Sequence, residues 1–130
     1  MPSHNPRATE FIFVINGSNL TTGHVDENGG KVVVNRGLRA GQSTLVPKGL
    51  IHFEQNNGCG VVTYLSAFNS EDPGAVTSGL RLWSLPEAAV SAAFGRPAPF
   101  FSVQASNFPG PGIANGRSNP ECAARCRLRF

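Results

Sequence analysis

Short runs of β-forming residues that alternate with turn residues are the feature that most constrains the fold of this 130-residue chain. We expect six strands, over residues 10–15, 20–26, 31–35, 41–46, 50–55 and 60–67. Gly, Asn and Pro mark turns at 16–18, 28–30 and 47–49. Strands that recur about every eight to twelve residues, with turn signals between them, are typical of an antiparallel sandwich or barrel. The sequence therefore predicts an all-β domain.

The run over residues 10–15 carries apolar side chains at every position except Glu10. This composition predicts a strand that is buried on both faces. A carboxylate in such a strand needs a partner, and a bound cation is a suitable one. The alternative is that Glu10 stands at the start of the strand and faces water.

The composition changes after residue 68. Residues 69–74 are typical of a loop, and an Ala-rich stretch follows that ends at Gly95. Ser84 and Glu87 have the spacing of a capping box, which predicts a short helix over 84–94. Residues 96–130 are rich in Pro, Gly, Ser, Asn and Arg without helical or strand periodicity, so we expect a disordered tail there.

The net charge of +3 does not indicate a nucleic-acid partner. Residues 1–95 carry six basic and seven acidic side chains, whereas residues 96–130 carry five arginines and one glutamate. The basic character therefore belongs to the tail, where no aromatic interleaving supports nucleic-acid binding. Since no apolar run reaches the roughly 18 residues of a membrane span, we expect no membrane partner either.

Three cysteines are present, at positions 59, 122 and 126. The spacing between Cys122 and Cys126, with no second pair and no nearby histidine, is poor for zinc. These two residues could form a disulfide only if the segment bends sharply. We expect none of the three to be functional.

The strongest motif is a set of residues with the spacing G-x5-P-x-G-x2-H-x3-N, which here are Gly41, Pro47, Gly49, His52 and Asn56. The Pro and Gly form a turn that sets the register of the following strand, and so the face on which the histidine points. A neutral imidazole that points into a barrel is a good ligand for a divalent metal. The alternative is a buried, hydrogen-bonded histidine beside a turn.

This string resembles the second motif of the cupin family. A second string resembles the first cupin motif, H-x-H-x3–4-E-x6-G, in the form found in germins and spherulins. Residues 6–10 (Pro-Arg-Ala-Thr-Glu) match that form, and Gly17 follows Glu10 at the family's interval. The resemblance covers roughly residues 4–95. It implies a cupin jelly-roll β-barrel over residues 1–95 that is incomplete at its N-terminus, with a short C-terminal helix.

The resemblance also implies one metal ion, manganese or alternatively iron, held by three imidazoles and one carboxylate. Here Glu10 and His52 take two of these places. Alignment on Pro6 puts Asn5 and Ser3 at the other two histidine positions of the first motif, whereas one inserted residue would make His4 a ligand. We expect His4, Glu10 and His52 to bind the metal, and we identify no catalytic residue.

For function, the resemblance implies an extracellular protein with redox activity on oxalate or superoxide, and so a small-molecule substrate. The alternative is a structural or storage-type cupin whose metal site has degraded, which the missing imidazole favours. Germin-type cupins form homo-oligomers, and Phe11, Phe13 and Ile15, opposite the Glu10 face, would suit such a contact. The N-terminal residues have no signal-peptide pattern, and the family's first strands are missing, so we expect the chain to begin part-way through the domain.

Overall fold

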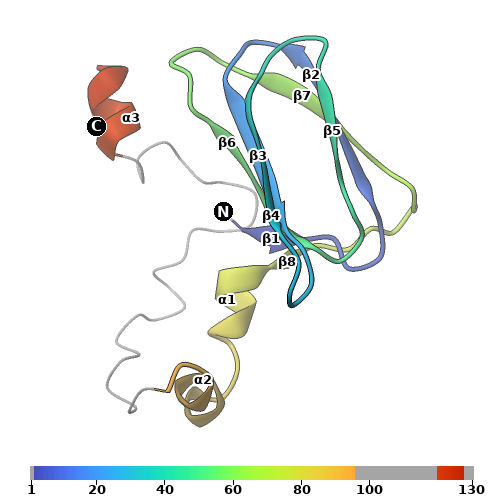
Figure 1. Cartoon of the computed structure of the whole chain (residues 1–130), viewed down its shortest axis with the longest axis vertical. Coiled ribbons are helices and arrows are strands. Elements are labelled where there is room, and N and C mark those ends of the chain that lie inside the picture. Colours follow the sequence, from blue (N-terminus) through green and yellow to red (C-terminus); the bar gives the residue numbers. More distant parts are fainter. Residues whose placement is uncertain (1, 96–119, 128–130) are drawn as a thin grey trace.

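The computed structural model describes residues 2–95 and 120–127. Two antiparallel β-sheets pack against each other as a sandwich (Figure 1). One sheet has the strand order β4-β3-β6-β1-β8 and the other has the order β5-β2-β7. The strands are β1 (Ser3–His4), β2 (Glu10–Asn16), β3 (Leu20–Val25), β4 (Val32–Leu38), β5 (Ser43–Val46), β6 (Ile51–Asn56), β7 (Thr63–Phe68) and β8 (Val76–Thr77). The predicted all-β fold is confirmed, as a jelly-roll sandwich and not as a closed barrel.

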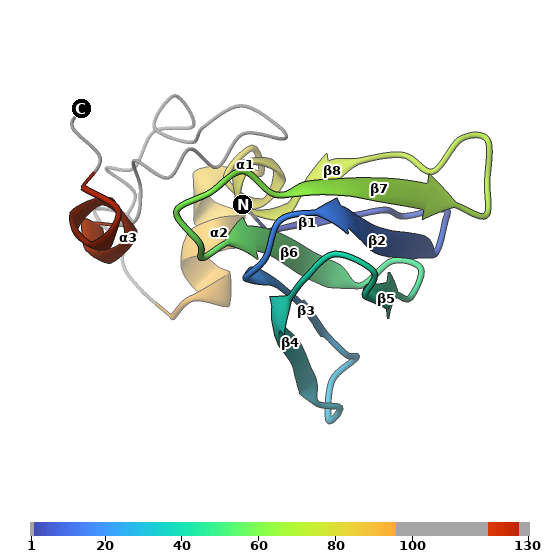
Figure 2. The same cartoon turned by 90° about the horizontal axis from the view of Figure 1, so that it is seen from above.

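Three helices lie to one side of the strands (Figure 2). They are α1 (Ser78–Leu82), α2 (Glu87–Ala93) and α3 (Pro120–Arg125). Within the two described ranges, every helix falls short of the length and apolar character that a bilayer crossing requires.

The six predicted strands form, with ends that differ by a few residues. The two-residue strands β1 and β8 were not predicted, because each exists only through pairing with distant segments. Ser3 pairs with Thr77 on one side and with His52 on the other. This pairing brings the N-terminal segment into the sheet that carries β6.

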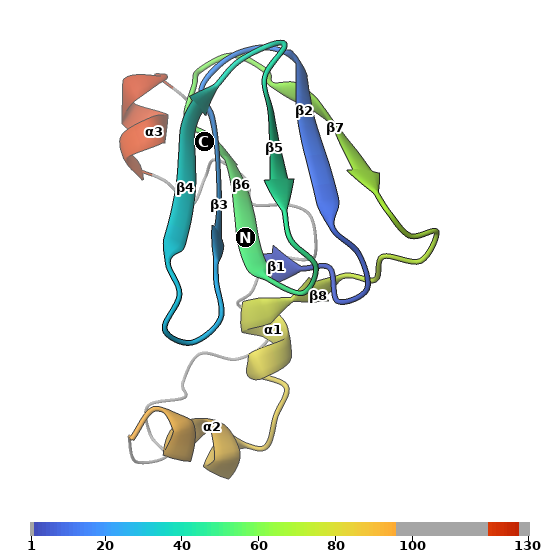
Figure 3. The same ribbon diagram turned by 45° about the vertical axis from the view of Figure 1, so that its right-hand side comes forward.

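The core lies between the two layers, which Figure 3 separates. Ile12 and Val14 on β2 pack with Leu20 on β3 and Val46 on β5, and all four are buried. Leu38 and Val62 close the edges of this cluster. The core is small, so the elements that position the site depend on backbone pairing as well as on packing.

Strand β2 alternates strictly, because successive side chains in a strand point to opposite faces. Glu10, Ile12 and Val14 are buried, whereas Phe11, Phe13 and Ile15 are 38%, 36% and 55% exposed. The prediction that this strand is buried on both faces was wrong for the single chain. The sheet β5-β2-β7 is covered on its inner side, and its outer side carries the exposed aromatic and aliphatic side chains.

Helix α2 forms where a helix was predicted, but the predicted capping box does not. Pro86 is the N-cap residue of α2, and no side chain caps it. The Ser84 hydroxyl instead donates to the carbonyl of Leu80 at 2.9 Å, because Ser84 follows the unpredicted helix α1.

The predicted tail falls partly outside the described residues, since 96–119 are not described. Residues 120–125 form helix α3, which the sequence did not predict. Proline suits the first position of a helix, and Glu121 in the first turn and Arg125 in the last turn complement the helix dipole.

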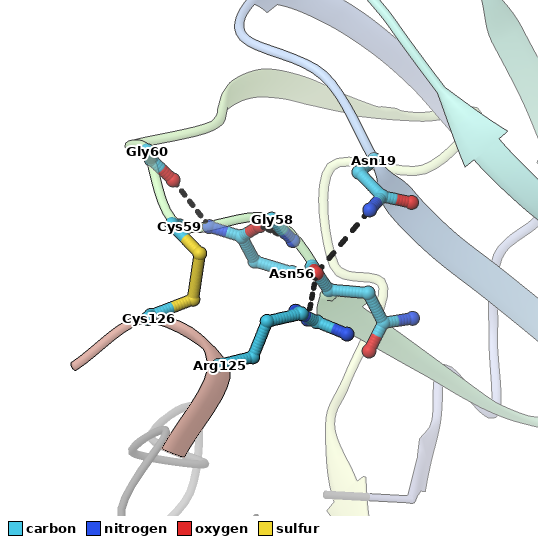
Figure 4. Close-up of a disulfide and its surroundings, with 8 residues drawn as sticks. Asn19, Asn56, Gly58, Cys59, Gly60, Arg125 and Cys126 are labelled. Carbon is cyan, nitrogen blue, oxygen red and sulfur yellow. Dashed lines mark hydrogen bonds between the residues drawn. A yellow bond between two sulfur atoms is a disulfide. The ribbon is translucent and has the colours of Figure 1, made fainter. Parts of the chain in front are cut away.

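A disulfide joins Cys59, in the turn between β6 and β7, to Cys126 after α3 (Figure 4). The Arg125 guanidinium also donates to the carbonyl of Asn57 in the same turn. The sequence predicted no role for these cysteines, because a separation of 67 residues hides the proximity of the two thiols.

Candidate metal centre

The turn before β6 determines where His52 points. Gly49 adopts φ +81°, a conformation that residues with a Cβ rarely adopt, and the Leu50 amide donates to the Pro47 carbonyl at 3.3 Å. The Gly49 amide donates to the carbonyl of Asn5 at 3.0 Å. This turn therefore starts β6 in a register that buries His52 and also ties β6 to the N-terminal segment.

Three titratable side chains meet between the sheets. Glu10 comes from β2, while His52 and Glu54 come from alternate positions of β6 and so share its inner face. The His52 Nε2 atom lies 3.2 Å from Glu10 Oε2 and 3.6 Å from Glu54 Oε1. One ligand atom from each residue lies within 4.8 Å of the other two, which makes this group a candidate site for a metal ion.

The hydrogen bonds of His52 determine its tautomer. Its Nδ1 lies 3.0 Å from the Leu50 carbonyl, which only a protonated Nδ1 can satisfy. In the neutral ring, Nε2 then presents a lone pair toward two carboxylates. Such an arrangement requires either a proton between the ring and a carboxylate or a metal ion among the three groups.

The pKa values follow from the same contacts. Burial would raise the pKa of Glu10, but hydrogen bonds from His52, Ser66 and Asn5 together with the His52 charge hold that pKa below its ordinary value. Burial would lower the pKa of His52, but Glu10, the Leu50 carbonyl and the charge of Glu54 raise it. When no metal is bound, the contact between the two side chains therefore favours the protonated form of His52 and the ionised form of Glu10.

The second carboxylate behaves differently from the first. Burial raises the pKa of Glu54, and the nearby charge of Glu10 raises it further against the effect of His52. Its Oε1 atom is buried and accepts no hydrogen bond. Burial and these two carboxylates also raise the pKa of Tyr64, which lies on the inner face of β7. The charge around Glu54 is thus incompletely balanced by the protein.

The donor set fits a divalent metal. Adjacent ligands of an octahedral ion with bonds of about 2.1 Å lie about 3 Å apart, close to the separations of His52 Nε2 from the two carboxylates. The Glu54 oxygen, which accepts no hydrogen bond, and the Nε2 atom of the neutral ring supply lone pairs where such an ion would sit. One imidazole nitrogen and carboxylate oxygens suit manganese or iron.

Of the three predicted metal ligands, the structure brings Glu10 and His52 together and leaves His4 outside the group. The His4 Nδ1 atom lies 3.4 Å from the Ser78 hydroxyl at the start of α1. It is Asn5 whose side-chain amide donates to Glu10 Oε2, at 2.8 Å. This contact matches the alignment in which Asn5 stands at the second histidine position. Metal binding by all three residues remains a prediction.

Sequence reasoning did not find Glu54 or the contact of Asn5. A signal for Glu54 was present, because a residue two positions after His52 on one strand must share its face. For Asn5, the alignment on Pro6 marked a histidine position of the motif but not a contact, and its amide meets Glu10 because the chain turns between β1 and β2.

The remaining motif residues shape the backbone around the site. Gly17 has φ +92°, and a Cβ there would lie 2.5 Å from the Val61 carbonyl oxygen, so only glycine fits. Gly41 also has a positive φ, of +84°, but in open space. The Asn56 side chain closes the next turn, donating to the Gly60 carbonyl and accepting from the Gly58 amide, both at 2.8 Å (Figure 4).

Comparison with known proteins identifies the family. The cupin family profile matches residues 1–96. Spherulin-1A of Physarum polycephalum is 40% identical over 86 residues, which are 66% of this chain and 34% of that protein. The rhicadhesin receptor of Pisum sativum is 34% identical over 97 residues, which are 72% of this chain and 43% of that protein. The chain therefore spans less than half the length of these relatives.

Solved structures agree with this assignment. A recombinant oxalate oxidase in complex with glycolate superposes with a TM-score of 0.73 at 31% identity, covering 82% of this chain and 55% of that one. A Bacillus subtilis oxalate decarboxylase mutant shares the fold, with a TM-score of 0.71 at 23% identity over 85% of this chain and 28% of that one. Profile, relatives and fold agree, and the chain belongs to the cupin family.

Proposed function

We propose that this chain is a germin-like cupin that binds a divalent metal ion, manganese in the first place, through Glu10, His52 and Glu54. The observation that carries the proposal is the buried Glu54 Oε1, which accepts no hydrogen bond and lies 3.6 Å from His52 Nε2. A buried acceptor of this kind costs free energy unless a donor or a cation satisfies it. With Nδ1 of His52 held by a carbonyl, Nε2 is the nitrogen that would bind the ion.

A bound manganese ion would supply a redox-active Lewis acid to a small oxygen-rich substrate. The chain's own residues orient the site. Asn5 holds Glu10 through its amide, and Leu50 holds the His52 ring. The relative that binds glycolate is an oxalate oxidase. This relation supports a small carboxylate, oxalate among them, as the substrate of the present chain, and superoxide is the other substrate that the germin resemblance implies.

A second function is favoured by the residues that replace the family's imidazoles. His4 contacts Ser78 and not the cluster, and Asn5 stands beside Glu10 without a basic nitrogen. A structural or storage-type cupin with a degraded site would look the same in the metal-free state. Proton-bound His52 between two carboxylates would then serve only as an internal ion pair.

Metal content decides between the two. The full chain is loaded with Mn²⁺ or Fe²⁺, desalted and analysed for metal per chain, beside His52→Ala and the matched control His4→Ala. We expect close to one ion per chain in the wild type and in His4→Ala, and none in His52→Ala. If the wild type binds no metal, the metal-binding proposal is wrong and the structural or storage-type function is the one that stands.

We also propose that the protein is extracellular and self-associates. A disulfide such as Cys59–Cys126 persists in oxidising compartments and is rare in the cytosol. The exposed Phe11, Phe13 and Ile15 suit a contact between copies. Non-reducing mass spectrometry of protein from its native source tests the first part, which fully reduced Cys59 would contradict. Sedimentation tests the second, which a monomer at high concentration would contradict.

A further inference from the structure

The carboxylates of the candidate site balance the charge of a divalent ion completely. Glu10 and Glu54 each contribute one negative charge, and His52 binds a metal only as the neutral ring. The loaded site therefore has no net charge. The family arrangement named above, with three imidazoles and one carboxylate, leaves one net positive charge on the loaded site.

No basic side chain in the part of the chain that the structure describes restores that positive charge. The ion pairs of Glu10 and Glu54 there are with His52 alone. Arg7 lies near in sequence, but its guanidinium is exposed and pairs with Asp72. An anionic ligand that enters the site thus meets a metal whose charge is already neutralised.

Glu54 is placed to act directly on such a ligand. Its Oε1 belongs to the group of ligand atoms that lie within 4.8 Å of one another, so a molecule bound to the same ion comes within a few ångströms of it. Charges at this separation in a buried site interact strongly, since the surroundings screen them less than water does. Each negative charge on the incoming ligand is repelled by Glu54.

We propose that Glu54 sets the charge of the ligand that this site accepts, favouring small oxygen ligands with one negative charge or none over dianions such as oxalate. The inference rests on the proposed metal binding and narrows its substrate class. On this inference, a site with two carboxylates and one imidazole differs from the family arrangement in the charge of the ligand that it prefers, and has not simply lost metal ligands.

The test uses the full chain loaded with Mn²⁺, with metal content measured first. Titration calorimetry or electron paramagnetic resonance of the bound Mn²⁺ then measures the binding of glycolamide, glycolate and oxalate. These ligands carry zero, one and two negative charges at neutral pH. In the wild type, we expect glycolamide and glycolate to bind at least as tightly as oxalate. Oxalate binding more than about tenfold tighter than glycolate would overturn the inference.

The variant Glu54→Gln keeps the size and an oxygen donor of the side chain and removes its charge. We expect it to tighten oxalate binding by about tenfold or more and to leave glycolamide binding within about twofold. The matched control Glu71→Gln removes the same charge from an exposed loop residue and should change neither. Equal oxalate affinity in wild type and in metal-loaded Glu54→Gln would overturn the inference while leaving metal binding intact. A wild type without metal would overturn both proposals. If only Glu54→Gln loses its metal, the relative affinities of the wild type for glycolamide, glycolate and oxalate decide the inference.

Discussion

The two segments that build the site reach it in different ways. The segment from Pro47 to Asn56 forms its own turn and strand through contacts between near neighbours, such as the bond from the Leu50 amide to the Pro47 carbonyl. The N-terminal segment, residues 3–10, is held by partners that are far away in sequence. Ser3 pairs with His52 and Thr77, and the Arg7 amide donates to the carbonyl of Pro73.

This difference explains why one predicted histidine lies in the site and the other does not. The orientation of His52 follows from the turn in front of it, so the motif alone predicts it. The orientation of His4 depends on how β1 lies between β6 and β8, and this pairing turns the ring toward Ser78. A locally determined motif is therefore a better guide to a ligand than one that needs tertiary pairing.

The largest effect is expected from the glycine that ends the first motif. Gly17 has φ +92°, and in Gly17→Ala the new Cβ would lie 2.5 Å from the Val61 carbonyl oxygen. The backbone must move to relieve this clash. We expect a loss of about 3 kcal/mol or more in the free energy of unfolding. Gly41→Ala, at φ +84° with nothing within 4 Å, should lose only about 1 kcal/mol. Urea denaturation measures both, and equal losses would show that close approach does not matter at Gly17.

The next effect concerns the ligand that the N-terminal segment supplies. Glu10→Gln removes the one carboxylate on β2 that faces His52 and keeps the amide contacts of the side chain. We expect Mn²⁺ affinity to fall by about a hundredfold or more, since loss of outer partners alone costs about ten- to a hundredfold. Titration with Mn²⁺ measures the change. An unchanged affinity would mean that the N-terminal segment contributes no ligand.

A smaller effect is expected when the missing imidazole is restored. Asn5 contacts Glu10 directly, so Asn5→His places a nitrogen ligand beside the candidate ion. We expect Mn²⁺ affinity to rise by about tenfold, a change of about 1.4 kcal/mol in binding free energy. His4→Ala should leave the affinity unchanged. If His4→Ala weakens binding instead, the N-terminal segment must shift by one residue when the metal binds.

The smallest effect is the pH dependence of the metal-free protein. The pKa of His52 is raised above 6.5, so its contribution to stability is complete below that pH and is lost as pH rises through the folded-state value. The pKa of Glu10 is lowered below 4.5, so its contribution is complete above that pH and is lost as pH falls through the folded-state value. The pKa of Glu54 is raised above 4.5, so its contribution to stability is complete below that pH and declines as pH rises through the folded-state value. The pair therefore stabilises the fold most between about pH 4.5 and 6.5.

Thermal unfolding of the metal-free chain on both sides of this window tests the pH dependence. We expect Tm to fall toward alkaline pH in the wild type and in His4→Gln, and to fall less in His52→Gln. A profile that His52→Gln leaves unchanged would assign the pH dependence to groups outside the site.

Sequence alone was sufficient where neighbouring residues decide the structure. The spacing of turn residues predicted six strands and the all-β class, and the Pro-x-Gly turn predicted that His52 faces inward. These features follow from steric limits on the backbone and from strand alternation, which act over a few residues. The helix near residue 90 was also predicted from neighbouring residues, although the predicted capping box does not form.

Tertiary structure decided what depends on residues that are distant in the chain. It placed Asn5 beside Glu10, turned His4 toward Ser78 and joined Cys59 to Cys126. It also left the Phe11 side of β2 exposed while burying Glu10 opposite, because only one face of that sheet meets the other layer. The packing of the two sheets decides which side chains surround an ion. The spacing of residues along one strand does not show which residues of the other sheet lie opposite.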